Sequence, residues 1–184
     1  MEILTKKSKG LSETYHAFKS ILDKKEKNFR SCLKVNDGIG IATNGKMLIR
    51  YNIDIKDGCY KASSLKKTEI ILQRTDDIDF PDTKDIFSTC DDLPFNFDMF
   101  SLYSKGKSFS IPANALSAHF ADKTGIILDF NMLSISCDLD GYLMSYDDRA
   151  KNAPVMCLCH NETIIIIMPI KSLKRGENRG INQK

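Results

Sequence analysis

The sequence predicts an α+β protein that is built from antiparallel sheets and two short helices. The apolar run from Thr163 to Lys171 has the β-branched composition of a strand buried on both faces, and Pro169 ends its hydrogen-bond ladder. Asn44-Gly45 and Asp140-Gly141 are tight-turn signals between apolar segments, which is typical of antiparallel hairpins. An order of strand, helix and strands also occurs twice along the chain. Together these observations predict two β-α-β-β-β units.

The first unit contains a helix predicted over residues 11–27. Leu11, Tyr15, Phe18 and Leu22 recur at helical spacing and form one apolar stripe. Short apolar segments follow, separated by turn residues. The strands expected in this unit are 31–35, 38–43, 46–52, 59–62 and 69–74.

The second unit repeats this pattern after an acidic segment, 75–92. We expect that segment to be an irregular but ordered strap, because it retains Ile78, Phe80, Ile86 and Phe87. The helix is predicted over 112–122, because proline is favoured at a first helical position. The strands expected in this unit are 108–111, 126–130, 133–138, 142–146, 154–160 and the final run at 163–171.

The pattern predicts a single domain over residues 1–170. Its half-units, about 1–75 and 105–170, are joined by a strap at 76–104. Residues 171–184 are basic and poor in apolar side chains, so we expect a disordered tail.

The composition is that of an ordinary globular protein, with 42% hydrophobic and 28% charged residues in 184. No apolar run approaches the length of a bilayer span, and the N-terminus does not read as a signal peptide, so we expect a cytoplasmic protein. The six cysteines are interpreted as reduced core thiols. Cys157-Leu158-Cys159-His160 lacks a second cysteine pair at zinc-site spacing, so no metal or other cofactor is expected.

Basic charge is concentrated at the two ends of the chain. Residues 1–30 carry eight Lys or Arg against four Asp or Glu, and residues 171–184 carry five against one, while the whole chain has a net charge of only +3. The cluster toward the end of the predicted first helix is Lys19, Lys24, Lys25, Lys27 and Arg30. Cations at that place complement the helix dipole, which explains them structurally, and contact with nucleic-acid phosphates is the alternative.

Four separated stretches, in the correct order, resemble the bacterial DNA polymerase III beta sliding clamp family. The stretch 41–48 resembles the clamp signature Ala-Thr-Asp-Gly-His-Arg-Leu, and 79–86 resembles the strap sequence Phe-Pro-Asp-Tyr-x-x-Val. The stretch 109–116 is similar to the strand-to-helix start of a clamp half-domain, and 166–171 to the terminal Val-Val-Met-Pro-Met-Arg. Asn44, Lys46-Met47 and Lys171 depart from these patterns, and the chain is short for a three-domain clamp subunit. The resemblance therefore implies a DNA-clamp-like fold in a minimal or phage-type homologue.

The resemblance implies two binding surfaces and no catalysis. In the family, the signature hairpin, the strap and the last strand line an apolar groove for short peptides of DNA polymerases and other replication proteins. The matching residues are Thr43, Gly45, Lys46, Met47, Leu48, Pro81, Ile86, Ile166, Met168, Pro169 and Ile170. Double-stranded DNA is the second implied partner, and ring formation implies a homo-oligomer. The matching basic residues are Lys19, Lys24, Lys25, Lys27, Arg30 and, on the second helix, Lys123.

Two other functions stay open from the sequence. A clamp mimic would bind replication proteins without encircling DNA, and its oligomeric state would distinguish it from a ring-forming clamp. A metal-dependent hydrolase would rely on Asp147-Asp148 with His119 or His160. The chain has no glycine-rich phosphate loop, no Gly-x-Ser-x-Gly and no His-Glu-x-x-His motif to support the hydrolase.

Overall fold

The computed structural model describes residues 1–23, 25–75, 78–98, 113–150 and 152–170. The predicted strand at 108–111, Lys24 and the basic tail lie outside these residues.

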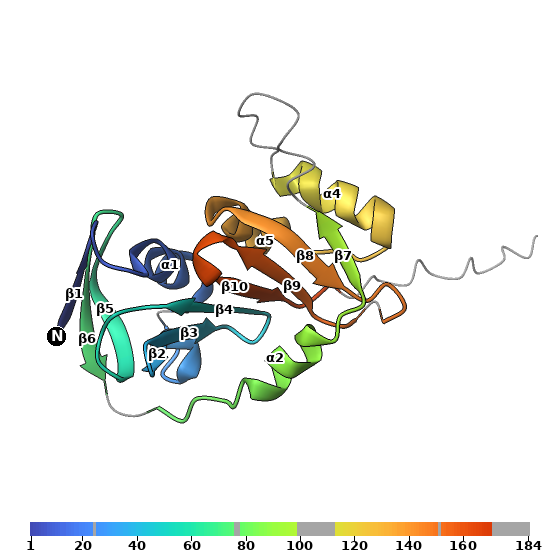
Figure 1. Ribbon diagram of the computed structural model, residues 1–184. Coiled ribbons are helices and arrows are strands. Elements are labelled where there is room, and N and C mark those ends of the chain that lie inside the picture. The colour runs from blue at the N-terminus through green and yellow to red at the C-terminus, as the bar shows by residue number, and fades with distance from the viewer. Residues whose placement is uncertain (24, 76–77, 99–112, 151, 171–184) are drawn as a thin grey trace, which may run out of the picture.

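The strands form one antiparallel sheet (Figure 1), and the fold is α+β as predicted. Ten strands lie in the order β1-β6-β5-β2-β3-β4-β10-β9-β8-β7. Their bounds are β1 Glu2–Thr5, β2 Leu33–Asn36, β3 Ile39–Thr43, β4 Met47–Asn52, β5 Gly58–Lys66, β6 Glu69–Thr75, β7 Phe95–Asp98, β8 Gly141–Tyr146, β9 Val155–Cys159 and β10 Ile164–Ile167.

The described residues also contain four helices and two short 3-10 turns. α1, Leu11–His16, continues into a π-helical turn, η1 Ala17–Ile21, in which the Leu22 N–H donates to the Ala17 carbonyl. The others are α2 Lys84–Asp91, α4 Ala113–Thr124 and α5 Phe130–Asp138, with 3-10 turns η2 Phe29–Ser31 and η3 His160–Glu162. Two of these helices, α2 and α5, go beyond the two helices that the sequence predicted.

The last strand lies in the middle of the sheet. β10 pairs with β4, where Ile164 is opposite Arg50, and with β9, where Ile165 is opposite Cys157. It is the strand through which β1–β6 and β7–β9 become one sheet. The apolar run at the end of the chain is therefore an interior strand, as its composition predicted.

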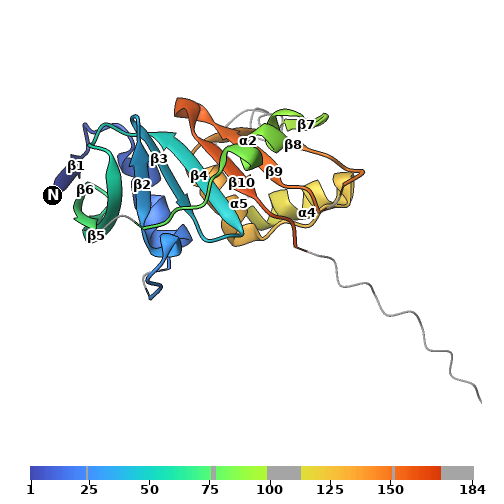
Figure 2. The same cartoon turned by 90° about the horizontal axis from the view of Figure 1, so that it is seen from below.

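Side chains alternate between the two faces of the sheet, and each face carries its own core. On β10, Ile165 and Ile167 join the main core, which also holds Phe18 of η1 and Leu133 of α5. The alternate residues of β10 belong to a second apolar cluster, with Cys90 of α2. We call these the helix face, covered by α1, η1, α4 and α5, and the outer face, covered by α2. Figure 1 and Figure 2 show α2 and α5 on opposite sides of β10.

The first helix is shorter than predicted. It ends at Leu22, whose backbone is extended, and the Asp23 N–H donates to the Arg30 carbonyl across the loop that follows. The chain therefore turns back before Lys25, Lys27 and Arg30, which lie in this loop and in η2 rather than on the helix, whereas Lys19 lies on η1.

The predicted strands at 126–130 and 133–138 are wrong, because residues 126–129 form no strand and residues 130–138 form α5. The Asp129 carboxylate accepts a hydrogen bond from the Asn131 N–H and caps this helix. Met132, Ile135, Ser136 and Leu139 recur at helical spacing on its inner side, a period that the shorter alternation of Leu133 and Ile135 concealed.

Most of the cysteines are core residues. All six lie among the described residues, and all but Cys137 are buried. Burial raises the pKa of Cys157 to about 12, so this thiol stays protonated in the core.

Candidate functional site

The outer face has an apolar floor where β4, β10 and β9 lie side by side. Leu48, Ile166 and Met156 project from these strands and are buried. The side chains that cover them come from α2 and the residues after it, namely Phe87, Cys90 and Leu93. We call Leu48, Met156 and Ile166 the outer floor.

Local interactions explain why α2 forms in this acidic segment. The Asp82 carboxylate accepts from the Lys84 N–H at the start of the helix, and the Thr83 carbonyl accepts from the Phe87 N–H. Phe87, Cys90 and Leu93 follow one another at three-residue spacing, which places them on one side of a helical path. The Arg50 guanidinium lies 5.2 Å from the centre of the Phe87 ring.

An open cavity of about 560 Å³ adjoins the outer floor. The strap and α2 form one wall, and β2, β3 and β4 form the other. Its apolar lining is Ile39, Ile41, Phe80, Pro81 and Phe87, and its cations are Lys34, Arg50 and Lys84. A cavity of this size, with apolar side chains in its lining, suits the apolar side chains of a short peptide.

The β3–β4 turn is held rigidly by its own side chains. The Thr43 hydroxyl donates to the Met47 carbonyl at 2.8 Å and accepts from the Gly45 N–H at 3.1 Å. The Asn44 side-chain oxygen accepts from the N–H groups of Lys46 and Met47, both at 2.9 Å. Asn44 thus supplies the acceptor that an aspartate would supply in the clamp signature.

The chain beyond β10 runs beside this turn. The Met168 N–H donates to the Lys46 carbonyl, and the Ile170 N–H donates to the Ile127 carbonyl, both at 2.8 Å. Met168, Ile170 and Ile127 are 41%, 50% and 43% exposed. We call these three residues the apolar rim. Large aliphatic side chains held at a surface in this way are available to a binding partner.

The structure divides the predicted groove residues among several places. Leu48 and Ile166 form part of the buried outer floor, and Pro81 lines the open cavity. Thr43, Gly45 and Lys46 form the turn; Met168 and Ile170 belong to the rim, with Pro169 between them; and Ile86 is exposed on α2.

Met47 does not lie with the other predicted groove residues. It lies in the main core on the helix face, because strand alternation points it away from Leu48. The sequence interpretation also missed Phe87, Met156 and Arg50. The three-residue apolar spacing from Phe87 to Leu93 was the available signal for Phe87.

The predicted DNA-contacting residues do not form one helical cluster. Lys19 is exposed on η1, and its ammonium lies 5.3 Å from the centre of the Tyr15 ring. Lys25 and Lys27 are exposed in the loop before η2, and Lys123 is exposed in the last turn of α4. Arg30 packs on the β3–β4 turn, with its guanidinium 3.4 Å from the place of a side-chain Cβ at Gly45. Lys24 lies outside the described residues.

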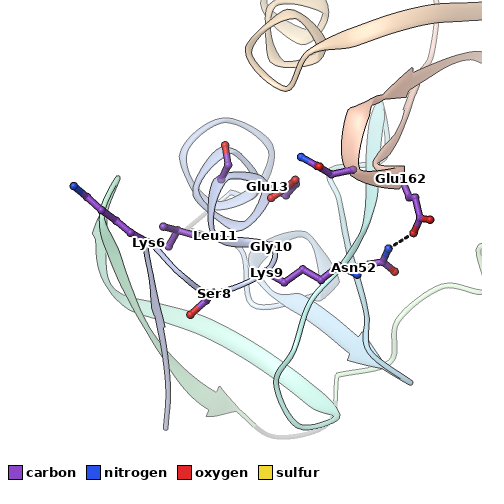
Figure 3. A pocket seen from close by; sticks show the side chains of 10 residues that line it. Lys6, Ser8, Lys9, Gly10, Leu11, Glu13, Asn52 and Glu162 are labelled. Atoms are coloured by element: carbon purple, nitrogen blue, oxygen red, sulfur yellow. Dashed lines mark hydrogen bonds between the residues drawn. The ribbon is translucent and has the colours of Figure 1, made fainter.

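A different set of lysines gathers at the β1 end of the sheet. Three adjoining cavities there share lining residues, of which Figure 3 shows the largest, about 590 Å³. We call the lysines that line them the lysine surface: Lys6, Lys7, Lys9, Lys19, Lys66 and Lys67. The acidic side chains of Glu13, Glu69, Asp138 and Glu162 also line these cavities, but Glu13 is buried and Glu162 accepts a hydrogen bond from Asn52. The surface can therefore attract an extended polyanion.

Two of the residues considered for hydrolysis are engaged by other side chains. The Asp147 carboxylate is bound by the Arg149 guanidinium at 3.1 Å, and this hydrogen bond lowers the pKa of Asp147. His119 packs on the Phe97 ring. Among the described residues, no group of three or more His, Cys, Asp and Glu side chains is placed to hold a metal ion. Within the same part of the chain, no helix is both long and apolar enough to cross a membrane.

Solved structures of bacterial replication proteins have a similar fold. They include proteins described as DNA polymerase III beta subunits from Eubacterium rectale (TM-score 0.54, 7% identity) and Thermotoga maritima (0.51, 10%), and a DNA polymerase sliding clamp from Bacillus subtilis (0.50, 9%). Each match covers 92% of this chain but only 65%, 64% and 66% of the respective clamp, so the chain spans less than two thirds of their length. No protein-family model and no curated protein matches the sequence. The structural likeness shows a clamp-like fold.

Proposed function

We propose that this clamp-like chain is a DNA replication accessory protein that binds short peptides of replication proteins, such as a DNA polymerase, and has no catalytic role. The observation that carries the proposal is the junction of β4 and β10. There the fold brings together the outer floor, the β3–β4 turn and the apolar rim from distant parts of the sequence.

The proposed peptide path runs from the open cavity, past α2, to the apolar rim. Anchoring side chains of a peptide would enter the cavity beside Phe80 and Pro81 and would pack on Met168 and Ile170. Methionine suits such a surface because its flexible side chain adapts to different anchors. Of the predicted groove residues, all except Met47 remain part of this proposal.

Replacing Met168 by aspartate should weaken peptide binding at least tenfold, because a charge would interrupt the apolar rim at a cost of about 1.4 kcal/mol or more. The measurement is fluorescence anisotropy of a labelled peptide rich in Leu and Phe, titrated with the full chain. Ile3→Asp is the matched control, because Ile3 is 50% exposed on β1, remote from the rim in the sheet order. Equal affinities of the wild type and Met168→Asp for the labelled peptide would show that the apolar rim is not part of the peptide-binding site.

We also propose that the chain contacts DNA phosphates from the β1 end, chiefly through the lysine surface. Lys19, the one predicted DNA-contacting residue in this set, lies there with Lys67 beside the same small cavity. His16 shares that cavity, and burial lowers its pKa, so the lysines supply the positive charge near neutral pH. Lys25, Lys27, Arg30 and Lys123 remain secondary candidates.

The Lys66→Glu, Lys67→Glu variant should lose most of its retention on immobilised double-stranded DNA at low salt. Each lost phosphate contact should reduce the steepness of the plot of log K against log salt concentration by about 0.9, so the loss of both contacts should reduce it by about 2. Lys25→Glu, Lys27→Glu is the comparison variant, and Lys56→Glu, an exposed lysine outside both sets, is the control. A larger loss of DNA retention in the comparison variant would indicate that the loop before η2, rather than the lysine surface, makes the main DNA contact.

A further inference from the structure

We propose that α2 is a built-in competitor that occupies the outer floor and that a partner peptide must displace. This inference rests on the proposed peptide binding. It assigns the floor a ligand class: a short peptide that presents an aromatic or aliphatic anchor together with a second apolar residue about one helical turn away.

The contacts of α2 show what kind of ligand fits the floor. Phe87 and Cys90 pack against Leu48, Met156 and Ile166 from one side of the helix. The floor therefore already receives a short amphipathic segment, an arrangement that many peptide-binding grooves use. The open cavity continues from Phe87, so a peptide that begins in the cavity meets α2 directly.

The outer side of α2 is exposed, as expected for an element that can be displaced. Asp85 and Thr89 are exposed outside the lining of the open cavity, and the Thr89 hydroxyl donates to the Asp85 carbonyl within the helix. A helix of this length is unstable in isolation, so it depends on its apolar contacts with the floor. Those contacts are the ones that a peptide with similar anchors would replace.

The first test uses a variant that removes the anchor of α2. Phe87→Ser should bind the labelled Leu- and Phe-rich peptide about tenfold more tightly than the wild type. In this variant α2 covers the outer floor in a smaller fraction of the molecules, so more of them can bind the peptide. Thr89→Ala is the matched control, since Thr89 is exposed on the same helix, and its affinity should equal that of the wild type. A synthetic peptide of residues 82–95 should compete with the labelled peptide for Phe87→Ser, and the same peptide carrying the serine should not.

The second test uses the wild-type chain, so it does not depend on the folding of the variant. Saturating peptide should increase hydrogen–deuterium exchange at the amides of residues 84–91 while β4, β9 and β10 stay protected. Equal peptide affinity of the wild type and Phe87→Ser, or exchange at 84–91 that is unchanged or slower in the complex, would overturn the inference and leave the proposed function intact. Absence of peptide binding by both proteins at high micromolar concentration would overturn the peptide binding itself, and the inference with it.

Discussion

Replacement of Phe120 by alanine is expected to lower the free energy of unfolding by about 4 kcal/mol, because a fully buried ring would leave a cavity. Phe120 projects from α4, and its ring meets the rings of Phe97 on β7 and Tyr146 on β8 edge-on, with centroids 5.2 Å and 5.3 Å apart. These contacts anchor α4 to β7 and β8, the two strands at one end of the sheet. Edge-on aromatic pairs stabilise the folded state by more than the area that they bury accounts for. Urea unfolding followed by circular dichroism measures the change.

Phe130→Ala is the control for this measurement. Phe130 is 53% exposed at the start of α5, so removing its ring should change the free energy of unfolding by less than about 1 kcal/mol. A loss below about 1 kcal/mol for Phe120→Ala as well would show that α4 is held by other contacts.

Replacement of Gly10 by alanine should destabilise the protein by about 3 kcal/mol, through backbone strain and a steric clash together. Gly10 has a φ of 82° just before α1, and a Cβ there would lie 2.8 Å from the Asn52 carbonyl oxygen and 3.2 Å from the Tyr51 ring. The neighbouring groups are backbone and a buried ring, so they cannot move aside at little cost. The change should appear as a lower urea midpoint and a lower Tm.

Gly45→Ala separates the two contributions. Gly45 has a similar φ of 84°, but the nearest atom to a Cβ at this position is the guanidinium of exposed Arg30, at 3.4 Å. The backbone strain alone should therefore cost about 1 kcal/mol. Equal losses for the two variants would show that the close approach of residue 10 to β4 contributes nothing.

The sequence was most informative where a turn and an alternating pattern coincide. The hairpin around Asn44-Gly45 and the final strand are found as predicted, because turn chemistry and two-residue periodicity are local properties. The α+β class is confirmed for the same reason, since the sheet is assembled mainly from such hairpins. The predicted single domain, 1–170 with half-units about 1–75 and 105–170, stays a prediction.

The sequence was least informative where the environment decides the structure. Residues 130–138 are compatible with a strand or a helix, and the Asp129 cap and burial against the sheet favour the helix. α2 was hidden inside an acidic segment that resembled a strap, because its packing partners Met156 and Ile166 lie far along the chain. For the candidate site, the resemblance pointed to residues of the turn and to Met168 and Ile170, but not to Ile127, and the face on which Met47 lies follows from the observed register.

The central position of β10 also governs the order in which this protein can fold during synthesis. Until Ile164–Ile167 has left the ribosome, β4 and β9 are the edges of two separate sheets, and each edge exposes unpaired backbone groups. Pairing β10 with β4 closes a loop that contains most of the second half of the chain, so this step is both late and entropically costly. The nascent chain therefore exposes these two unpaired strand edges until β10 emerges.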